Sequence, residues 1–364
     1  MKIGIISHLK YPIKEPFAGG LEMHTYALAN GLIQRGHDVK LFAPSDSDVS
    51  LNIDPMHLSA LDCESFRNHE PNPDYFSQQF VQEHHAYMNL MLRLANEDFD
   101  VIHNNSLNYV PLSMAHTIRT PMITTLHTPP FSWLQSAVLC EQMHKKVRYT
   151  TVSKQNATSW EPYLSVEEII YNGIDLNKWR YSPRAEEGLA VWFGRITPEK
   201  GTHLAIHAAH EAGMRIYLAG PVFDQDYYAE QVSPYLNDDD RYLGHLSHQE
   251  LTEVIGIGSV FLCTPCWEEP YGLVVAESLA CGTPVAAFRR GALPEILNED
   301  TGRLATPNSI DALAQAAKEA QSLSRENCRR HAENICSLDR MVDQYVSLYD
   351  SILNPMEIVC PTAV

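Results

Sequence analysis

Two carboxylates flank a proline–glycine turn in the second half of the chain. Glu269 and Glu277 are eight positions apart, a little over two helical turns. Glu277 lies in an otherwise apolar run, so its carboxylate needs hydrogen-bond donors. A pair of sugar hydroxyls would supply them, and a salt bridge to an arginine is the alternative. Gly272 is small enough to let a phosphate approach the amides of Leu273 and Val274.

A second pattern places two cations where a helix should begin. Gly194-Arg195 follows the apolar run Leu189–Phe193, and Lys200-Gly201 stands just before the next helical periodicity. Free backbone N–H groups, the helix dipole and two positive charges would converge there, which is the environment that a diphosphate prefers. An exposed loop with ordinary surface charges would show the same residues, and the pattern by itself leaves both interpretations open.

Weaker signals lie in the first half of the chain. Gly19 and Gly20, followed by Glu22 and His24, occupy the first strand-to-helix crossing. Paired glycines there would let a ligand approach closely, although a flexible turn explains them equally well. His127 follows the apolar strand Met122–Leu126. A lone histidine is more often structural than catalytic, and a position at a strand end favours a functional role.

Patterns that would indicate a metal or a P-loop are incomplete. Cys263 and Cys266 have metal-like spacing but no second pair. The histidines form no helix-borne pair with a glutamate base, and no Walker-type glycine loop occurs. Aspartate-rich stretches such as 46–48 and 238–240 lie in polar segments that we expect to be exposed. We therefore predict no metal site.

Composition narrows the class of protein. The 364 residues suggest two domains, and 45% hydrophobic with 20% charged residues is typical of a globular enzyme. A formal net charge of −18 argues against nucleic-acid binding and against broad attachment to anionic lipid. No run approaches the roughly 20 apolar residues that span a bilayer. The first apolar run is too short for a signal peptide, and the cysteines stand among apolar residues, so we expect a cytoplasmic protein.

Strand-like and helix-like segments alternate along most of the chain. In the first half the predicted strands are Lys2–Ser7, Val39–Ala43, Val101–His103, Met122–Leu126 and Tyr149–Val152. After a turn-rich stretch at 172–187 they are Leu189–Phe193, Arg215–Ala219, Tyr242–Leu243, Val260–Cys263 and Val285–Phe288. The segment from Ser45 to Pro73 breaks the rhythm as an irregular insertion, and Gln78–Asn96 has the pattern of an amphipathic helix. The order predicts an α/β protein of two doubly wound parallel sheets, with ligands in the cleft between the domains.

Order and spacing of these motifs resemble the retaining glycosyltransferases of family 4. The matching pieces include Gly19-Gly20, Arg35–Val39, Thr151–Ser153, Asn172–Asp175, Gly194-Arg195, Lys200-Gly201, Tyr242–Gly244, Glu269–Glu277, Ala280–Val285 and Pro294–Ile296. Residues 45–100 match no part of the family pattern. The resemblance implies a GT-B fold, in which two Rossmann-like domains face each other across a cleft. It implies an acceptor-side domain at 1–172, a donor-binding domain at 173–340 and a closing helix at about 341–353 that returns to the first domain.

The resemblance also implies residue roles. The catalytic group would be His127, Arg195, Lys200 and Glu269. The donor would meet Gly19, Gly20, Gly194, His245, Leu246, Tyr271, Gly272, Leu273, Val274 and Glu277, and Glu22 and His24 would lie on the acceptor side. Among these, Arg195 and Lys200 would hold the diphosphate, Glu277 would accept hydrogen bonds from the ribose, and Glu269 would contact the transferred sugar.

The implied reaction moves a hexose with retention from a nucleoside diphosphate sugar, most often a UDP-hexose such as UDP-glucose, to a hydroxyl. The acceptor could belong to a saccharide, a glycolipid or a small molecule, and no metal would be needed. A nucleotide-sugar epimerase of the same architecture would lack the paired-glutamate segment. A catalytically silent nucleotide-sugar binder is the other alternative. The nearest approach to a basic membrane face is His144–Arg148, so membrane contact would be peripheral at most. The oligomeric state is not predicted.

Overall fold

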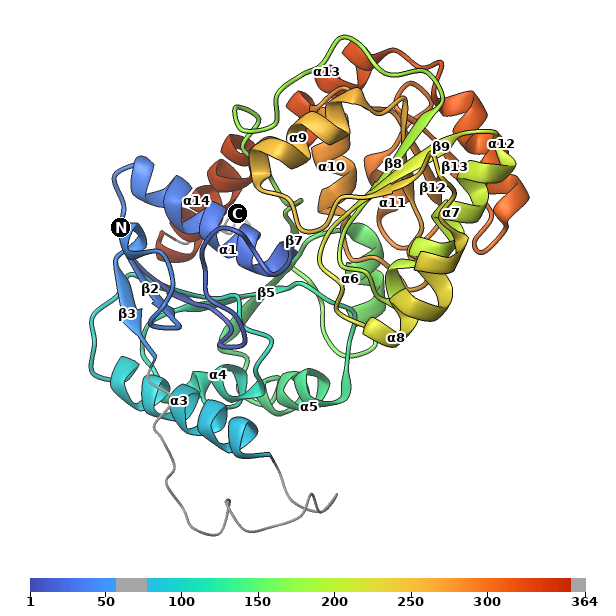
Figure 1. Cartoon of the computed structure of the whole chain (residues 1–364). Helices are drawn as coiled ribbons and strands as arrows, with labels where there is room; N and C mark the ends of the chain where they lie inside the picture. The colour runs from blue at the N-terminus through green and yellow to red at the C-terminus, as the bar shows by residue number, and fades with distance from the viewer. Residues whose placement is uncertain (57–76, 355–364) are drawn as a thin grey trace. The chain divides into compact units, whose positions relative to one another are not determined.

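The computed structural model describes residues 1–56 and 77–354, which form two compact units (Figure 1). The first unit contains Met1–Thr150, Trp160–Ile170 and the chain from Met341 on. The second contains Thr151–Ser159 and Tyr171–Arg340. The short segment Thr151–Ser159 therefore packs with the second unit, although sequence order assigns it to the first domain.

The first unit is built on a seven-stranded sheet in the order β3-β2-β1-β4-β5-β6-β7. The pairs β3–β2, β2–β1, β1–β4 and β4–β5 are parallel. The strands are β1 (Lys2–Ile6), β2 (Asp38–Ala43), β3 (Ile53–Pro55), β4 (Val101–Asn104), β5 (Met122–Leu126), β6 (Val147–Thr151) and β7 (Glu168–Ile169). The helices are α1 (Gly20–Gln34), α3 (Gln78–Leu94), α4 (Tyr109–Ser113), α5 (Ser132–Glu141) and α14 (Leu338–Leu353), with 3₁₀ turns η1 (Val49–Leu51) and η2 (Ala115–Thr117). Helix α6 (Lys154–Trp160) follows β6, but all of it except Trp160 packs with the second unit. Helices cover both faces of this sheet, with α3, α4 and α5 on one face and α1 and α14 on the other (Figure 1).

The expected insertion after β2 is partly regular. Residues 53–55 form the edge strand β3, which pairs in parallel with β2, so this part of the sequence prediction is wrong. The strand was hidden because it is short, contains a proline and borders only one neighbour, which leaves no hydrophobic pattern to detect. The insertion from residue 57 to 73 lies outside the described residues. The amphipathic helix is confirmed as α3, and the Ser77 side chain caps it by accepting from the Phe80 N–H.

The second unit is built on a six-stranded, entirely parallel sheet in the order β10-β9-β8-β11-β12-β13. Its strands are β8 (Leu189–Phe193), β9 (Arg215–Ala219), β10 (Arg241–Tyr242), β11 (Val260–Cys263), β12 (Val285–Phe288) and β13 (Gly302–Ala305). Its helices are α7 (Thr202–Glu211), α8 (Gln225–Tyr227), α9 (His248–Ile257), α10 (Leu273–Ala280), α11 (Leu293–Ile296), α12 (Ile310–Ala320) and α13 (Arg325–Ile335), with single turns η3 (Pro198–Lys200), η4 (Tyr228–Val232) and η5 (Ser233–Tyr235). The four buried residues of β11 and of β12 lie at the centre, covered by α7 and α12 on one face.

Both sheets reverse their strand order at one point. In the first sheet, β2 and β3 lie on one side of β1, and β4 to β7 follow in order on its other side. In the second sheet, β9 and β10 lie on one side of β8, and β11 to β13 lie on the other. The loops that follow the strands on the two sides of such a reversal diverge, which leaves space at the carboxyl edge of the sheet for a ligand. In the first unit these loops begin at Ser7 and Asn105, and in the second at Gly194 and Thr264.

Helix α14 adds polar contacts to the core of the first unit. Tyr349 Oη lies 2.6 Å from Nδ1 of His103, and Tyr345 Oη lies 3.1 Å from Thr125 Oγ1. All four side chains are buried. These buried hydrogen bonds orient the helix, because sliding it along the sheet would leave both hydroxyls unpaired.

Arg325, at the start of α13, joins several loops of the second unit. Its guanidinium donates to the carbonyl oxygens of Ser182, Gly258 and Gly256 at 2.7–2.8 Å, and also to Thr283 Oγ1 at 3.1 Å. Burial lowers the pKa of Arg325 from its usual value. The planar fork suits this task, because its donors point in fixed directions toward acceptors that come from different loops.

Arg325→Ala is expected to lower the free energy of unfolding by about 3 kcal/mol, because part-buried carbonyls lose their donors. Arg330→Ala is the matched control on the same helix: the Arg330 side chain is 62% exposed and forms an i,i+4 ion pair with Glu326, so its loss should change the free energy by about 0.5 kcal/mol or less. Urea denaturation compares the two variants. Equal effects would contradict the bridging role.

Candidate active site

Two loops at the carboxyl edge of the second sheet are hydrogen-bonded to each other. Thr264 Oγ1, just after β11, donates to the Lys200 carbonyl at 2.9 Å. The N–H of Cys266 donates to the Glu199 carbonyl at 2.8 Å. The loop after β8 and the loop after β11 therefore form one structure at the point where the strand order reverses.

Lys200 and Glu269 form an ion pair on these loops. Lys200 Nζ lies 2.7 Å from Glu269 Oε2, and the two side chains are only 22% and 14% exposed. The indole N–H of Trp267 donates to the same Glu269 oxygen at 3.0 Å, and Lys200 Nζ lies 5.3 Å from the Trp267 ring centroid. The structure thus brings Lys200 and Glu269, two members of the predicted catalytic group, into contact. The Glu269 carboxylate accepts from Lys200 and from the indole N–H of Trp267.

Arg195 carries a charge that no carboxylate in the described part of the chain neutralises. It lies half-buried after β8, with its guanidinium 5.5 Å from the centroid of the Phe223 ring. A cation stacked on an aromatic ring keeps its N–H donors directed outward, so it remains able to bind an anion.

Helix α10 begins without a side-chain cap. Its N-cap is Gly272, with φ of 101°, in the left-handed region that favours glycine. A β-carbon at this position would lie 2.7 Å from Leu293 Cδ2. The first-turn N–H groups of Leu273 and Val274 receive no side-chain acceptor, so the positive end of this helix is open to an anion.

Glu277 is the unusual residue of α10. It is 7% exposed, and among the described residues its carboxylate has no hydrogen-bond or salt-bridge partner. The arginine salt bridge considered as an alternative is therefore not formed. Burial raises the pKa of Glu277 to about 8. A carboxylate held in this state gains from hydroxyl donors that come from outside the protein.

The remaining donor-site candidates occupy different positions. His245 is exposed and Leu246 half-buried in the loop after β10, beside Gly244, whose carbonyl accepts from the Gly220 N–H at 2.8 Å. Gly194 directly follows β8. Tyr271 is 3% exposed and its hydroxyl contacts Cys336 Sγ at 3.7 Å, so its side chain packs in the interior.

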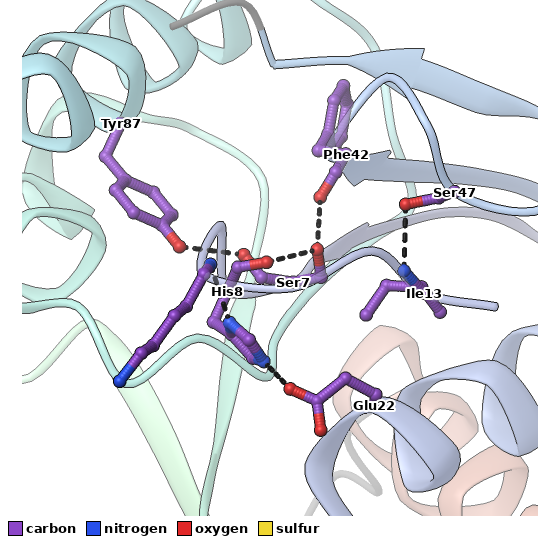
Figure 2. Close-up of polar contacts among 8 residues, drawn as sticks. Ser7, His8, Ile13, Glu22, Phe42, Ser47 and Tyr87 are labelled. Atoms are coloured by element: carbon purple, nitrogen blue, oxygen red, sulfur yellow. Dashed lines mark hydrogen bonds and ion pairs between the residues drawn. The ribbon is translucent and has the colours of Figure 1, made fainter. Parts of the chain in front are cut away.

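In the first unit, Glu22 pairs with a residue that sequence reasoning missed. His8 follows β1 and directs its imidazole toward Glu22 on the first turn of α1 (Figure 2). The N–H of Lys10 donates to His8 Nδ1 at 3.0 Å, so the ring proton of a neutral His8 is on Nε2, which faces Glu22. The detectable signal was position: His8 lies at the carboxyl end of the first strand.

Ser7 anchors the strand end that carries His8. Its hydroxyl lies 3.0 Å from the Phe42 carbonyl, and its own carbonyl accepts from Tyr87 Oη at 2.9 Å (Figure 2). The contacts link β1 to β2 and to α3. They hold the loop after β1 in place beside α1.

The glycine pair at α1 meets a carboxylate. Gly19 is the N-cap in an extended conformation, and Gly20 is the first helical residue. A β-carbon on Gly19 would lie 3.1 Å from Glu22 Oε2. The negative charge that this helix end favours is thus already supplied by Glu22, which makes it a less favourable place for a phosphate than the sequence suggested.

His127 and His24 lie in a buried polar cluster. Their ring centroids are 4.7 Å apart, and His127 Nε2 lies 2.8 Å from Asn105 Oδ1. Burial lowers the pKa of His127 well below its usual value and that of nearby His103 to about 3, so both imidazoles are neutral at pH 7. Asn105, which the sequence did not single out, is fully buried, and its Nδ2 has no hydrogen-bond partner within the described chain.

The described residues contain neither a metal-binding cluster nor a helix that could span a membrane. Residues 1–56 and 77–354 contain no cluster of three or more His, Cys, Asp or Glu side chains arranged to hold a metal ion. In the same residues, every helix is too short or too polar to cross a bilayer.

Comparison with known proteins identifies the class. The model described as Glycosyltransferase Family 4 matches residues 18–178, and that described as Glycosyl transferases group 1 matches residues 174–335. Glycogen synthase from Mycobacterium tuberculosis is 26% identical over 340 residues, which cover 82% of each chain. Together with the two doubly wound units, these matches define a glycosyltransferase of the GT-B type.

Solved structures share the fold at low sequence identity. Sucrose-phosphate synthase from Thermosynechococcus elongatus superposes with a TM-score of 0.78 at 18% identity, covering 98% of this chain and 100% of that one. HepE from Anabaena, solved in complex with UDP and glucose, has a TM-score of 0.70 at 18% identity over 96% and 99% of the two chains. The predicted fold class is confirmed, and the chain belongs to glycosyltransferase family 4.

Glu277→Gln is expected to raise the free energy of unfolding of the ligand-free protein at pH 7 by about 3 kcal/mol. The unfolded chain releases the Glu277 proton near pH 4.5, whereas the folded protein keeps it to about pH 8. The wild type therefore loses stability as pH rises through this window, and the glutamine variant does not. Below about pH 4 the two proteins should be equally stable.

Urea denaturation from pH 4 to 8 measures the difference. Glu250→Gln provides a control of opposite sign, because hydrogen bonds from Ser247 lower the pKa of Glu250. That variant should lose stability at neutral pH and approach the wild type as the pH falls. A pH-independent difference for Glu277→Gln would contradict the raised pKa.

Proposed function

We propose that the protein transfers a hexose, with retention, from a nucleoside diphosphate sugar to an acceptor hydroxyl. The observation that carries this proposal is the buried Glu277 carboxylate, which has no partner in the described part of the chain and lies on a helix whose N-terminus has no side-chain cap. A nucleoside diphosphate offers what both features lack: ribose hydroxyls to donate to Glu277, and phosphate oxygens to accept from Leu273 and Val274.

Charge supports the role of the loop cations. Breaking the sugar–phosphate bond creates an oxocarbenium-like sugar and a diphosphate of growing negative charge. Arg195 and Lys200 would stabilise that leaving group more in the transition state than in the ground state. Lys200 would exchange Glu269 for phosphate, which would free Glu269 to accept from the sugar hydroxyls. With two cations to neutralise the leaving group, we propose that the reaction needs no metal.

We propose UDP as the leaving group and glucose or another hexose as the transferred sugar. HepE, which has the same fold, was solved with UDP and glucose. His245 and Leu246 would lie beside the base. Retention would follow from attack on the same face, with the departing phosphate taking the acceptor proton. His127, neutral at pH 7, would then act as a hydrogen-bonding group and not as an acid.

The acceptor is a hydroxyl of a saccharide, a glycolipid or a small molecule. Glu22 and His24 are the acceptor-side candidates in the first unit, and His8 joins them through its contact with Glu22. We further propose a cytoplasmic location, in agreement with the free thiols of Cys263, Cys281 and Cys328.

Calorimetric titration with UDP, GDP and ADP, without metal, tests the donor proposal. UDP is expected to bind the wild type and to bind Glu277→Ala far more weakly, because the ribose hydroxyls lose their acceptor. Tighter binding of GDP or ADP than of UDP would show that the donor carries guanine or adenine in place of uracil. Binding that is equally strong in the variant would remove Glu277 from the site.

Lys200→Met is expected to lower kcat for transfer about 100-fold, since one donor to the leaving group is lost. Lys318→Met on the exposed face of α12 is the matched control, and its kcat should equal that of the wild type. Steady-state release of nucleoside diphosphate measures both. A kcat near the wild-type value for Lys200→Met would contradict the proposed stabilisation of the leaving group.

A further inference from the structure

The first turn of α6 has its N–H groups capped by two side chains. Glu295, on α11, accepts from the N–H groups of Lys154 at 2.9 Å and Gln155 at 2.7 Å. Ser153 Oγ accepts from the Asn156 N–H at 3.1 Å. This segment is the part of the chain that packs with the second unit while the residues before and after it belong to the first.

The Ser153 hydroxyl also donates a hydrogen bond. Ser153 is fully buried, and its Oγ lies 2.6 Å from the carbonyl oxygen of Pro270. Since the hydroxyl accepts from Asn156, its single proton is directed to Pro270. Pro270 immediately follows Glu269, and as a proline it has no N–H with which to anchor this part of the backbone.

The segment before α11 supports the other side of the same loop. The N–H of Ala292 donates to the Glu269 carbonyl at 2.9 Å, and the N–H of Gly291 donates to the Glu268 carboxylate at 2.7 Å. A β-carbon at Gly291 would lie 2.1 Å from the Glu269 carbonyl oxygen, so the two backbones are in direct contact. Glu295 lies on α11 itself and therefore ties this support to α6.

We infer that Ser153 is a positioning residue for Glu269. Its hydroxyl fixes the carbonyl of Pro270, the segment before α11 fixes the carbonyl of Glu269, and Glu295 locks the two supports together. The Glu269 side chain is thereby held where it meets Lys200 and Trp267. The consequence for turnover rests on the proposed function, whereas the consequence for the loop does not.

Two substitutions separate this role from helix capping. Ser153→Ala removes both the cap and the bond to Pro270. Ser153→Gly removes the same bond but keeps most of the capping stability, because glycine is a good N-cap residue. Ser309→Ala is the control: its hydroxyl caps α12 in the same way and makes no contact with the loop.

Hydrogen–deuterium exchange tests the positioning in the full chain. Peptides covering residues 266–272 and 290–296 should exchange roughly tenfold faster in both Ser153 variants and unchanged in Ser309→Ala. If exchange were faster in Ser153→Ala and Ser309→Ala but not in Ser153→Gly, the loss of a helix cap would explain the effect and the inference would be overturned. Unchanged exchange in both Ser153 variants would also overturn it.

Turnover tests the link to Glu269. Release of nucleoside diphosphate is measured with UDP-glucose, GDP-mannose and ADP-glucose as donors. For the donor that the wild type uses, kcat should fall about tenfold in both Ser153 variants, while KM stays nearly constant. A loosened loop with unchanged kcat would overturn the positioning of Glu269. If the wild type consumes none of the three, the donor proposal fails, and exchange alone decides whether Ser153 holds the loop.

Discussion

Hydrogen bonds between neighbouring strand-end loops are the interactions on which the candidate donor site depends. Parallel strands deliver their loops to one edge of the sheet but do not fix the loops against each other. In the second unit Thr264, after β11, binds the Lys200 carbonyl in the loop after β8. Ser153, which follows β6 of the other sheet but packs with this unit, binds the carbonyl of Pro270. The Lys200–Glu269 ion pair follows from this arrangement, since a part-exposed pair is screened by water and cannot by itself order two loops.

The same unit contains a group whose burial opposes folding. Glu277 has no partner among residues 1–56 and 77–354, so its ionised form disfavours the folded state and its pKa is raised. Residues that bind a ligand often destabilise the ligand-free protein, because their polar groups have no partner until the ligand is bound. The N-terminus of the same helix, α10, has the opposite need. Its free N–H groups require an acceptor, whereas the Glu277 carboxylate requires donors.

In the first unit, buried histidine side chains are hydrogen-bonded to other side chains of the protein. His103 is hydrogen-bonded to Thr125 and Tyr349, and His127 to Asn105, so these imidazoles have partners at one or both nitrogens. The network reaches α14, which contributes both buried tyrosines from the end of the chain. Burial keeps the pKa values of His103 and His127 low, so these two imidazoles are neutral at pH 7 and hydrogen-bond without being protonated.

Apolar runs along the sequence located the strands of both sheets except the edge strands β3, β7 and β13, because burial on both faces of a central parallel strand leaves a continuous apolar run. Motif spacing likewise determined the family and the group Arg195, Lys200, Glu269 and Glu277, since those residues lie at strand ends and helix starts that local sequence marks. Tertiary structure alone decided that Tyr271 packs inward, that Glu22 pairs with His8, that Asn105 contacts His127 and that Ser153 holds Pro270. Apart from Tyr271, whose burial is set by its neighbours in the fold, each of these facts is a hydrogen bond or ion pair between residues distant in the chain. Such a contact depends on the direction of two side chains after the strands have paired, and neither residue type nor spacing encodes that direction.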